Sequence, residues 1–147
     1  MQIQQLNRTD AERIQIIVKN VDGSGSITTG NGACLVQAGA SIDGLSAVKQ
    51  AAAAIGGFAG IATQDIPING YGLVCAWGYV ASVLISNVGT SITVTAGNKL
   101  KPGAVAGTFF SSLTDEALST LLYRYVVAGS TNTISAAAYV TGIVRAL

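Results

Sequence analysis

The feature that most constrains the fold is a run from residue 66 to residue 98 that contains no charged residue. A helix that crosses a membrane needs about 20 consecutive, predominantly apolar residues. This run is interrupted too often for that, by Pro67, Asn69, Gly70, Gly72, Gly78, Ser82, Ser86, Asn87 and Gly89. We therefore expect several short β-strands separated by turns, and we expect no transmembrane helix.

The clearest strand in this run spans residues 71–80, where side chains of different size alternate between two faces. One face is predicted to carry Leu73, Cys75, Trp77 and Tyr79. Asn69-Gly70 stands just before this strand and is the best hairpin-turn signal in the chain, because both residues tolerate positive φ. Residues 12–20 alternate in the same way, which predicts a second strand with Ile14, Ile16 and Val18 on one face.

Shorter strands are predicted at residues 27–29, 33–37, 58–62, 82–86, 91–95, 108–110, 123–128 and 139–146, whereas residues 99–107 are predicted to form a loop. For residues 38–57 a short helix and an irregular connection both remain open, because Ala51–Ala54 favours a helix but no amphipathic stripe accompanies it. Thr114 is a suitable N-cap for a short helix over residues 115–122.

Together these signals predict an all-β fold, a small β-barrel or β-sandwich with an extended N-terminal arm and one or two short helices. The polar residues 1–11 form the predicted arm, and residues 12–147 form a single β-rich domain. The N-terminus has no basic stretch followed by an apolar core, so we expect no signal peptide.

Charged residues make up only 10% of the chain, with eight Lys and Arg against seven Asp and Glu. Freely soluble domains carry about 25–35% charged residues on their surface. The composition therefore favours a protein that hides part of its outside against a partner, although a lone domain with a Ser/Thr-rich coat remains the alternative. The formal net charge of +1 is too small to concentrate nucleic acid or anionic lipid, so we expect neither nucleic acid nor membrane as a partner.

The chain offers little catalytic chemistry. It has no histidine, the commonest acid–base residue and metal ligand. Cys34 and Cys75 stand in apolar stretches, and they are predicted to be buried free thiols. Ser46-Ala47-Val48-Lys49 matches the Ser-x-x-Lys pattern, in which a helical turn brings lysine to a serine nucleophile, but its companion motifs are missing. We expect no enzyme, no catalytic residues, no cofactor and no metal site, and a small Ser46/Lys49 hydrolase remains as the enzymatic alternative.

Trp77 and Tyr79 share one strand face, where such a pair more often fills a β-core than anchors an interface. We expect core packing and keep the interface as the alternative. The candidate contacts to a partner or to another copy of the chain are Ile3, Leu6, Arg8, Trp77 and Tyr79.

Several elements from Phe58 onward follow one another in a recognisable order. They are Gly60-Ile61-Ala62, Asp65-Ile66-Pro67, Gly70-Tyr71-Gly72-Leu73-Val74, Trp77-Gly78-Tyr79, Ala96-Gly97-Asn98-Lys99-Leu100, Pro102-Gly103-Ala104 and Gly142-Ile143-Val144. This order resembles the small capsid decoration proteins of tailed bacteriophages, also called cement or head-stabilising proteins. Asn98 stands where those proteins usually have aspartate.

The resemblance implies a β-barrel-like, often trimeric protein that sits on the outer surface of the virion and is assembled in the host cytoplasm. Its implied partners are the major capsid protein and further copies of itself, and its implied role is to stabilise the shell by bridging capsid subunits. Within the arm, residues 1–9 are the candidate for an extended tether that orders on binding, and a merely disordered terminus is the alternative. Another minor virion protein, such as a head-fibre base, is the alternative.

Overall fold

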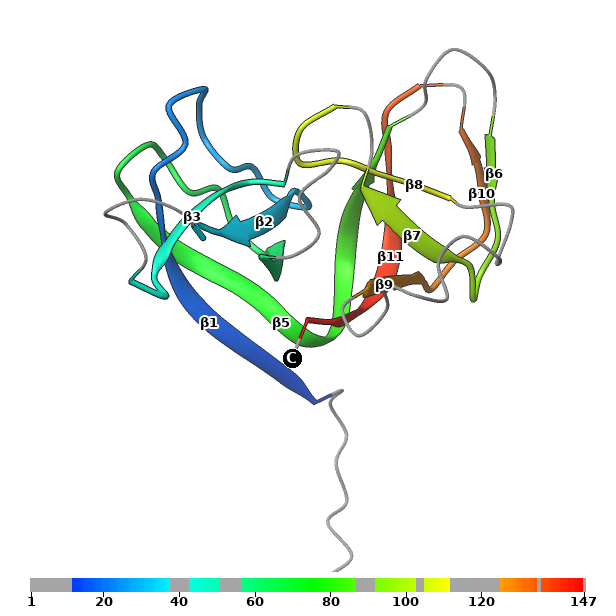
Figure 1. The fold of residues 1–147 in the computed structure, drawn as a ribbon. Helices are drawn as coiled ribbons and strands as arrows, with labels where there is room; N and C mark the ends of the chain where they lie inside the picture. Colours follow the sequence, from blue (N-terminus) through cyan, green and yellow to red (C-terminus); the bar gives the residue numbers. More distant parts are fainter. Residues whose placement is uncertain are drawn as a thin grey trace, which may run out of the picture.

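The computed structural model describes residues 12–37, 43–50, 57–86, 92–102, 105–111, 125–134 and 136–146, and these residues contain strands and no helix (Figure 1). The strands are β1 (Arg13–Asn20), β2 (Gly32–Leu35), β3 (Ser46–Lys49), β4 (Phe58–Ala62), β5 (Tyr71–Ile85), β6 (Ile92–Val94), β7 (Lys99–Pro102), β8 (Phe109–Ser111), β9 (Tyr125–Ala128), β10 (Asn132–Ile134) and β11 (Ala138–Arg145). The all-β prediction is confirmed. The expected arm with Ile3, Leu6 and Arg8, and the expected helix over residues 115–122, lie outside the described residues.

Strand β5 belongs to two rings of hydrogen-bonded strands. The nine-stranded sheet runs β1-β3-β2-β4-β5-β11-β9-β7-β8, and it closes on itself twice, through additional β1–β5 and β5–β8 pairings. Each ring contains one parallel pair, β1–β3 or β5–β8, among otherwise antiparallel neighbours. Figure 1 shows the rings as two lobes, with β5 running from one into the other. Closure pairs strand edges that would otherwise be open to other chains.

The two halves of β5 have different neighbours. β1 pairs with its first half, from Lys19↔Tyr71 to Arg13↔Gly78, whereas β11 pairs with the stretch from Trp77 to Ile85. Gly78 lies where the pairing of β5 changes from β1 to β11. It has a φ of 103°, and a Cβ there would collide with the carbonyl oxygen of Glu12. Only glycine meets both conditions. The two strands predicted over residues 71–80 and 82–86 are therefore one continuous strand of 15 residues.

The core consists of two buried clusters. One joins β1 to β5 within the first ring and contains Val18, Ile27, Ala33, Ala47, Ala59, Ala62, Ile66 and Val74. The other fills the second ring and also includes Cys34, Phe58, Ile61 and Cys75 of the first. Phe58 of β4 meets Phe109 of β8 edge to face, with ring centroids 5.9 Å apart. The lobes are therefore packed against each other as well as joined by β5.

Three local predictions are wrong. The strand predicted at residues 27–29 is only an isolated bridge between Ile27 and Ile66. Ser46–Lys49 is strand β3, between β1 and β2, rather than part of a helix or an irregular connection. Lys99–Pro102 is strand β7, between β8 and β9, rather than a loop. In the last two cases long-range pairing overrides weak local propensity, as the Val21 and Val36 N–H bonds to the Ala47 and Ser46 carbonyls illustrate. The turn before β5 is confirmed, with Asn69 at a φ of 61°.

Replacing Gly60 with alanine tests the close approach of β4 to β5. Gly60 has a φ of 141°, and a Cβ there would collide with the carbonyl oxygen of Cys75. Gly97 has a φ of 89° but open space around it, so Gly97→Ala is a matched control for backbone strain alone. We expect Gly97→Ala to lower the free energy of unfolding by about 1–2 kcal/mol and Gly60→Ala by at least about 3 kcal/mol. Equal losses in denaturant titrations would contradict this account.

The thiols provide a second test of the core. Cys34 and Cys75 are both free and buried, as predicted. Burial raises the pKa of the Cys34 thiol to about 12 and also raises the pKa of Cys75. Because the thiolate is the reactive form, we expect neither thiol of the folded protein to react with DTNB at about pH 8, and both to react in guanidinium chloride. Rapid reaction of one thiol in the native protein would show that its cluster is open to solvent.

Candidate contact surface

Some large hydrophobic side chains of the described chain face solvent. They are Ile14, Ile17, Ile68, Tyr71, Trp77, Val105, Tyr139 and Ile143. Single exposed hydrophobic residues are normal on any protein, so their position relative to one another decides whether they matter. Ile14, Trp77 and Ile143 come from three neighbouring strands, β1, β5 and β11, and keep 43%, 37% and 43% of their surfaces exposed.

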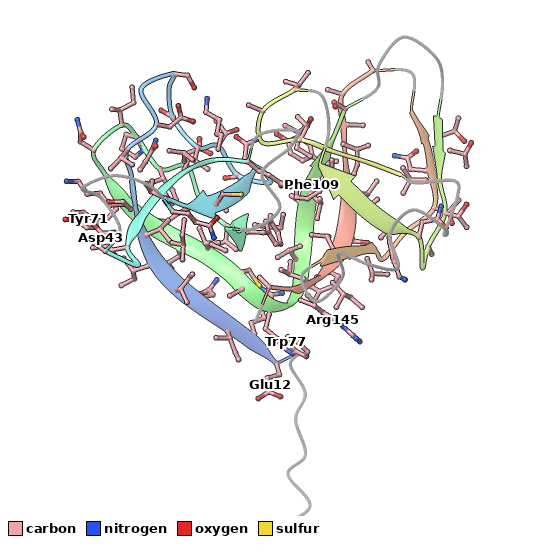
Figure 2. All side chains as sticks on the ribbon, in the orientation of Figure 1. Glu12, Asp43, Tyr71, Trp77, Phe109 and Arg145 are labelled. Carbon is pink, nitrogen blue, oxygen red and sulfur yellow. The ribbon has the colours of Figure 1, made fainter. Side chains whose placement is uncertain are left out.

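The strand register brings these side chains together. Trp77 of β5 lies opposite Ile14 on one side and Arg145 on the other, and Tyr79 lies opposite Ile143. Side chains of directly paired residues project from the same face of a sheet. We call these five residues, Ile14, Trp77, Tyr79, Ile143 and Arg145, the Trp77 surface. Figure 2 shows Trp77 and Arg145 close together at the base of the molecule, beside Glu12 where β1 begins.

Two guanidinium groups lie over the aromatic rings of this surface. The Cζ atom of Arg145 is 5.7 Å from the centroid of the Trp77 ring, and that of Arg13 is 5.5 Å from the Tyr79 ring. Such pairs contribute about 0.5–1 kcal/mol at exposed sites and restrict the rings. Trp, Tyr and Arg are also the residue types enriched among the energetically dominant positions of interfaces. The arrangement is therefore suited to burial against another protein.

The prediction that Trp77 is a core residue is wrong, and Tyr79 is half-buried. The buried face of β5 at this point carries Gly78 and Val80, whereas Trp77 on the opposite face is exposed. A shift of register between Ile14 and Gln15 places Ile14 beside Trp77, whereas Val18, predicted to share its face, is fully buried. The partners of Trp77 were missed because pairing between distant strands leaves no local signal.

The Ser46-x-x-Lys49 pair does not have the geometry of its pattern. On a strand, residues three positions apart point to opposite faces, whereas the pattern needs one face of a helix. Ser46 is buried, and its hydroxyl donates to Oδ2 of Asp43 at 2.8 Å. The backbone N–H of Lys49 donates to Asp22 at 3.0 Å. Ser46 and Lys49 thus contact different aspartates. The described residues contain no cluster of three or more His, Cys, Asp or Glu side chains that could hold a metal ion.

The chain matches no family model, no curated protein and no solved structure. In the described ranges no helix is long and apolar enough to cross a membrane. Any assignment of function therefore starts from the geometry of the Trp77 surface and from the motifs of the sequence.

Asp43 gives the strand β3 region a pH-dependent stability. It accepts hydrogen bonds from the backbone N–H of Ser46 at 2.6 Å, from that of Leu45 at 2.8 Å and from the Ser46 hydroxyl. These bonds lower the pKa of Asp43 to about 2, from about 3.9 in an unfolded chain. The stabilisation is therefore present above about pH 4 and is lost as the pH falls towards 2.

We expect Asp43→Asn to be less stable than the wild type near neutral pH, because asparagine lacks the charge that these donors stabilise. The difference should shrink as the pH falls from about 4 to 2. Denaturant titrations of both proteins across this range measure it. A difference that stays constant with pH would show that the charge of Asp43 contributes nothing.

Proposed function

We propose that the chain is a structural virion protein that binds the outer surface of a bacteriophage capsid and stabilises the shell by bridging major capsid protein subunits. The observation that carries the proposal is the Trp77 surface, a cluster of apolar, aromatic and arginine side chains exposed on an otherwise weakly charged protein. Two motifs of the resemblance to decoration proteins, Trp77-Gly78-Tyr79 and Gly142-Ile143-Val144, supply three of its five residues.

The proposed mechanism is adhesion without a chemical step. Burying apolar surface contributes about 25 cal/mol per Å², and a standard interface buries about 800 Å² on each partner. The cost of association leaves only part of this as net affinity. The contribution is repeated at every site on a shell, however, so expansion or rupture of the shell must break many such contacts at once.

The fold supports this mechanical role. β5 carries Trp77 and Tyr79 of the Trp77 surface, and it is hydrogen-bonded to β1 and β4 in one ring and to β11 and β8 in the other. A force applied at Trp77 is therefore shared among several strands. The composition also supports the proposal. Only 10% of the residues are charged, and a capsid would cover part of this weakly charged surface.

Self-association is part of the proposal, as a trimer like those of the proteins that the sequence resembles. Exposed hydrophobic residues away from the Trp77 surface are available for contacts between copies. Ile17 and Tyr71 lie at the other end of the β1–β5 pair, where Ile17 is opposite Leu73 and Tyr71 is opposite Lys19. If the protein is instead another minor virion component, electron microscopy of particles will place it away from the regular lattice of capsid subunits.

Co-sedimentation with empty heads tests the proposed function. We expect the wild type to bind saturably, and Trp77→Ala to weaken binding by at least about 30-fold, because truncating a dominant interface residue costs about 2 kcal/mol or more. Ile68→Ser is the matched control, since Ile68 is 48% exposed in the turn before β5 and outside the Trp77 surface. We expect this control to bind as the wild type does.

The two possible failures have different meanings. Absence of wild-type binding to any head preparation would overturn the proposed function. Undiminished binding by Trp77→Ala would overturn the assignment of the Trp77 surface. Thermal unfolding of each variant verifies that a loss of binding is not a loss of fold.

A further inference from the structure

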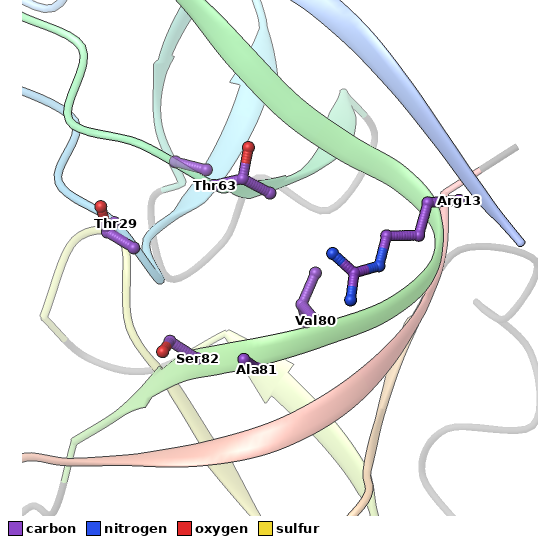
Figure 3. Close-up of a pocket in the computed structure, with 7 residues that line it drawn as sticks. Arg13, Thr29, Thr63, Val80, Ala81 and Ser82 are labelled. Carbon is purple, nitrogen blue, oxygen red and sulfur yellow. The ribbon is translucent and has the colours of Figure 1, made fainter. Parts of the chain in front are cut away.

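A cleft lies on the inner side of the bend in β5 (Figure 3). Its volume is about 180 Å³, and it is lined by Arg13, Thr29, Ala62, Thr63, Val80, Ala81 and Ser82. A water molecule in the liquid occupies about 30 Å³. The cleft is therefore large enough for one side chain with its adjoining backbone and too small for a folded element.

One edge of β5 is open along this cleft. β11 occupies the other edge from Trp77 to Ile85. On the cleft side, pairing with β1 ends at Gly78, and the next contact is the Leu84 N–H bond to the Gly30 carbonyl at 3.0 Å. Between these points no strand of the described chain pairs with this edge of β5. Because backbone polar groups alternate between the two edges of a strand, only those of alternate residues between Gly78 and Leu84 point towards this edge, and no strand of the described chain pairs with them there.

The cleft also presents two hydrogen-bond donors, Arg13 and Ser82, for which no acceptor lies among the described residues. The Arg13 side chain extends towards Val80 in Figure 3, and no carboxylate of the described residues forms an ion pair with it. The half-buried Ser82 hydroxyl likewise has no hydrogen-bond partner among the described residues. Asp65 contacts the lining residue Thr29, and it accepts hydrogen bonds from the Thr29 N–H at 2.7 Å and the Thr29 hydroxyl at 2.9 Å.

We propose that this cleft binds an acidic side chain carried on an extended segment of a partner protein. The planar guanidinium of Arg13 matches a carboxylate through two parallel hydrogen bonds, and Ser82 offers a further donor. The open edge of β5 offers main-chain hydrogen bonds to an extended segment, as in strand addition. Arg13 thus favours a carboxylate, and the open edge favours an extended main chain, so both features favour an acidic residue within an extended segment. The inference goes beyond the proposed function and does not require the partner to be a capsid protein.

NMR titration of the full-length, ¹⁵N-labelled protein with short peptides tests the proposal. The probes are acetyl-Val-Glu-Val-amide, its glutamine counterpart and sodium acetate. We expect the glutamate peptide to shift the amide signals of Thr63, Val80, Ala81 and Ser82 saturably. The glutamine peptide should bind at least about tenfold more weakly, because hydrogen bonds to a charged group are the stronger ones. Acetate alone should bind more weakly than the glutamate peptide, because it lacks the main chain.

Variants separate the roles of charge and geometry. We expect Arg13→Gln to reduce binding of the glutamate peptide to the level of the glutamine peptide, and Arg13→Lys to give an intermediate loss. Lys19→Gln is the matched control, because it removes one positive charge from the same strand outside the cleft. The wild-type comparison of the two peptides stands even if a variant fails to fold.

Three results would overturn the proposal: no saturable shifts at the cleft, equal binding of the two peptides, or acetate binding as tightly as the glutamate peptide. The last would indicate a site for free anions only. None of these results bears on whether the protein binds heads through the Trp77 surface, so the two proposals fail independently.

Discussion

The structure depends on the backbone hydrogen bonding of β5, which serves two rings in succession. β1 pairs with this strand up to Gly78, and β11 takes over from Trp77 onward. The handover is possible because Gly78 lacks a Cβ, so the carbonyl oxygen of Glu12 can approach the strand closely. The contact between Phe58 and Phe109 connects the two lobes a second time.

The two functional candidates arise at the same bend, on its two sides. On the outer side, the ends of β1 and β11 place Ile14 and Arg145 next to Trp77. On the inner side, β1 ends its pairing at Gly78, no described strand pairs with the next part of this edge of β5, and Arg13 lines the cleft. Arg13 connects the two, since its guanidinium also lies over the Tyr79 ring. In a protein with only 15 charged residues, eight basic and seven acidic, two of its arginines thus lie beside these aromatic rings.

Local signals predicted the elements that depend on local interactions. The strand over residues 71–80, the Asn69-Gly70 turn and the burial of both cysteines were predicted correctly. The predictions failed where a distant strand decides the outcome. Ser46–Lys49 has no strong β-propensity of its own, and it is a strand because β1 and β2 supply hydrogen bonds on both sides. Trp77 has a typical core side chain, yet 37% of its surface is exposed, beside Ile14 and Arg145 of strands that are distant in the sequence.

The sequence by itself determined that the chain is β-rich, that its thiols are buried and that its surface carries little charge, because these properties depend on residue type and short-range periodicity. Only the tertiary structure decided that β5 is one strand shared by two rings, which residues adjoin Trp77, and where an arginine meets an open strand edge. These features depend on pairing between strands far apart in the chain. The physical reason is that backbone hydrogen bonds are nearly independent of side-chain identity, so register and neighbours are settled by how the whole core packs.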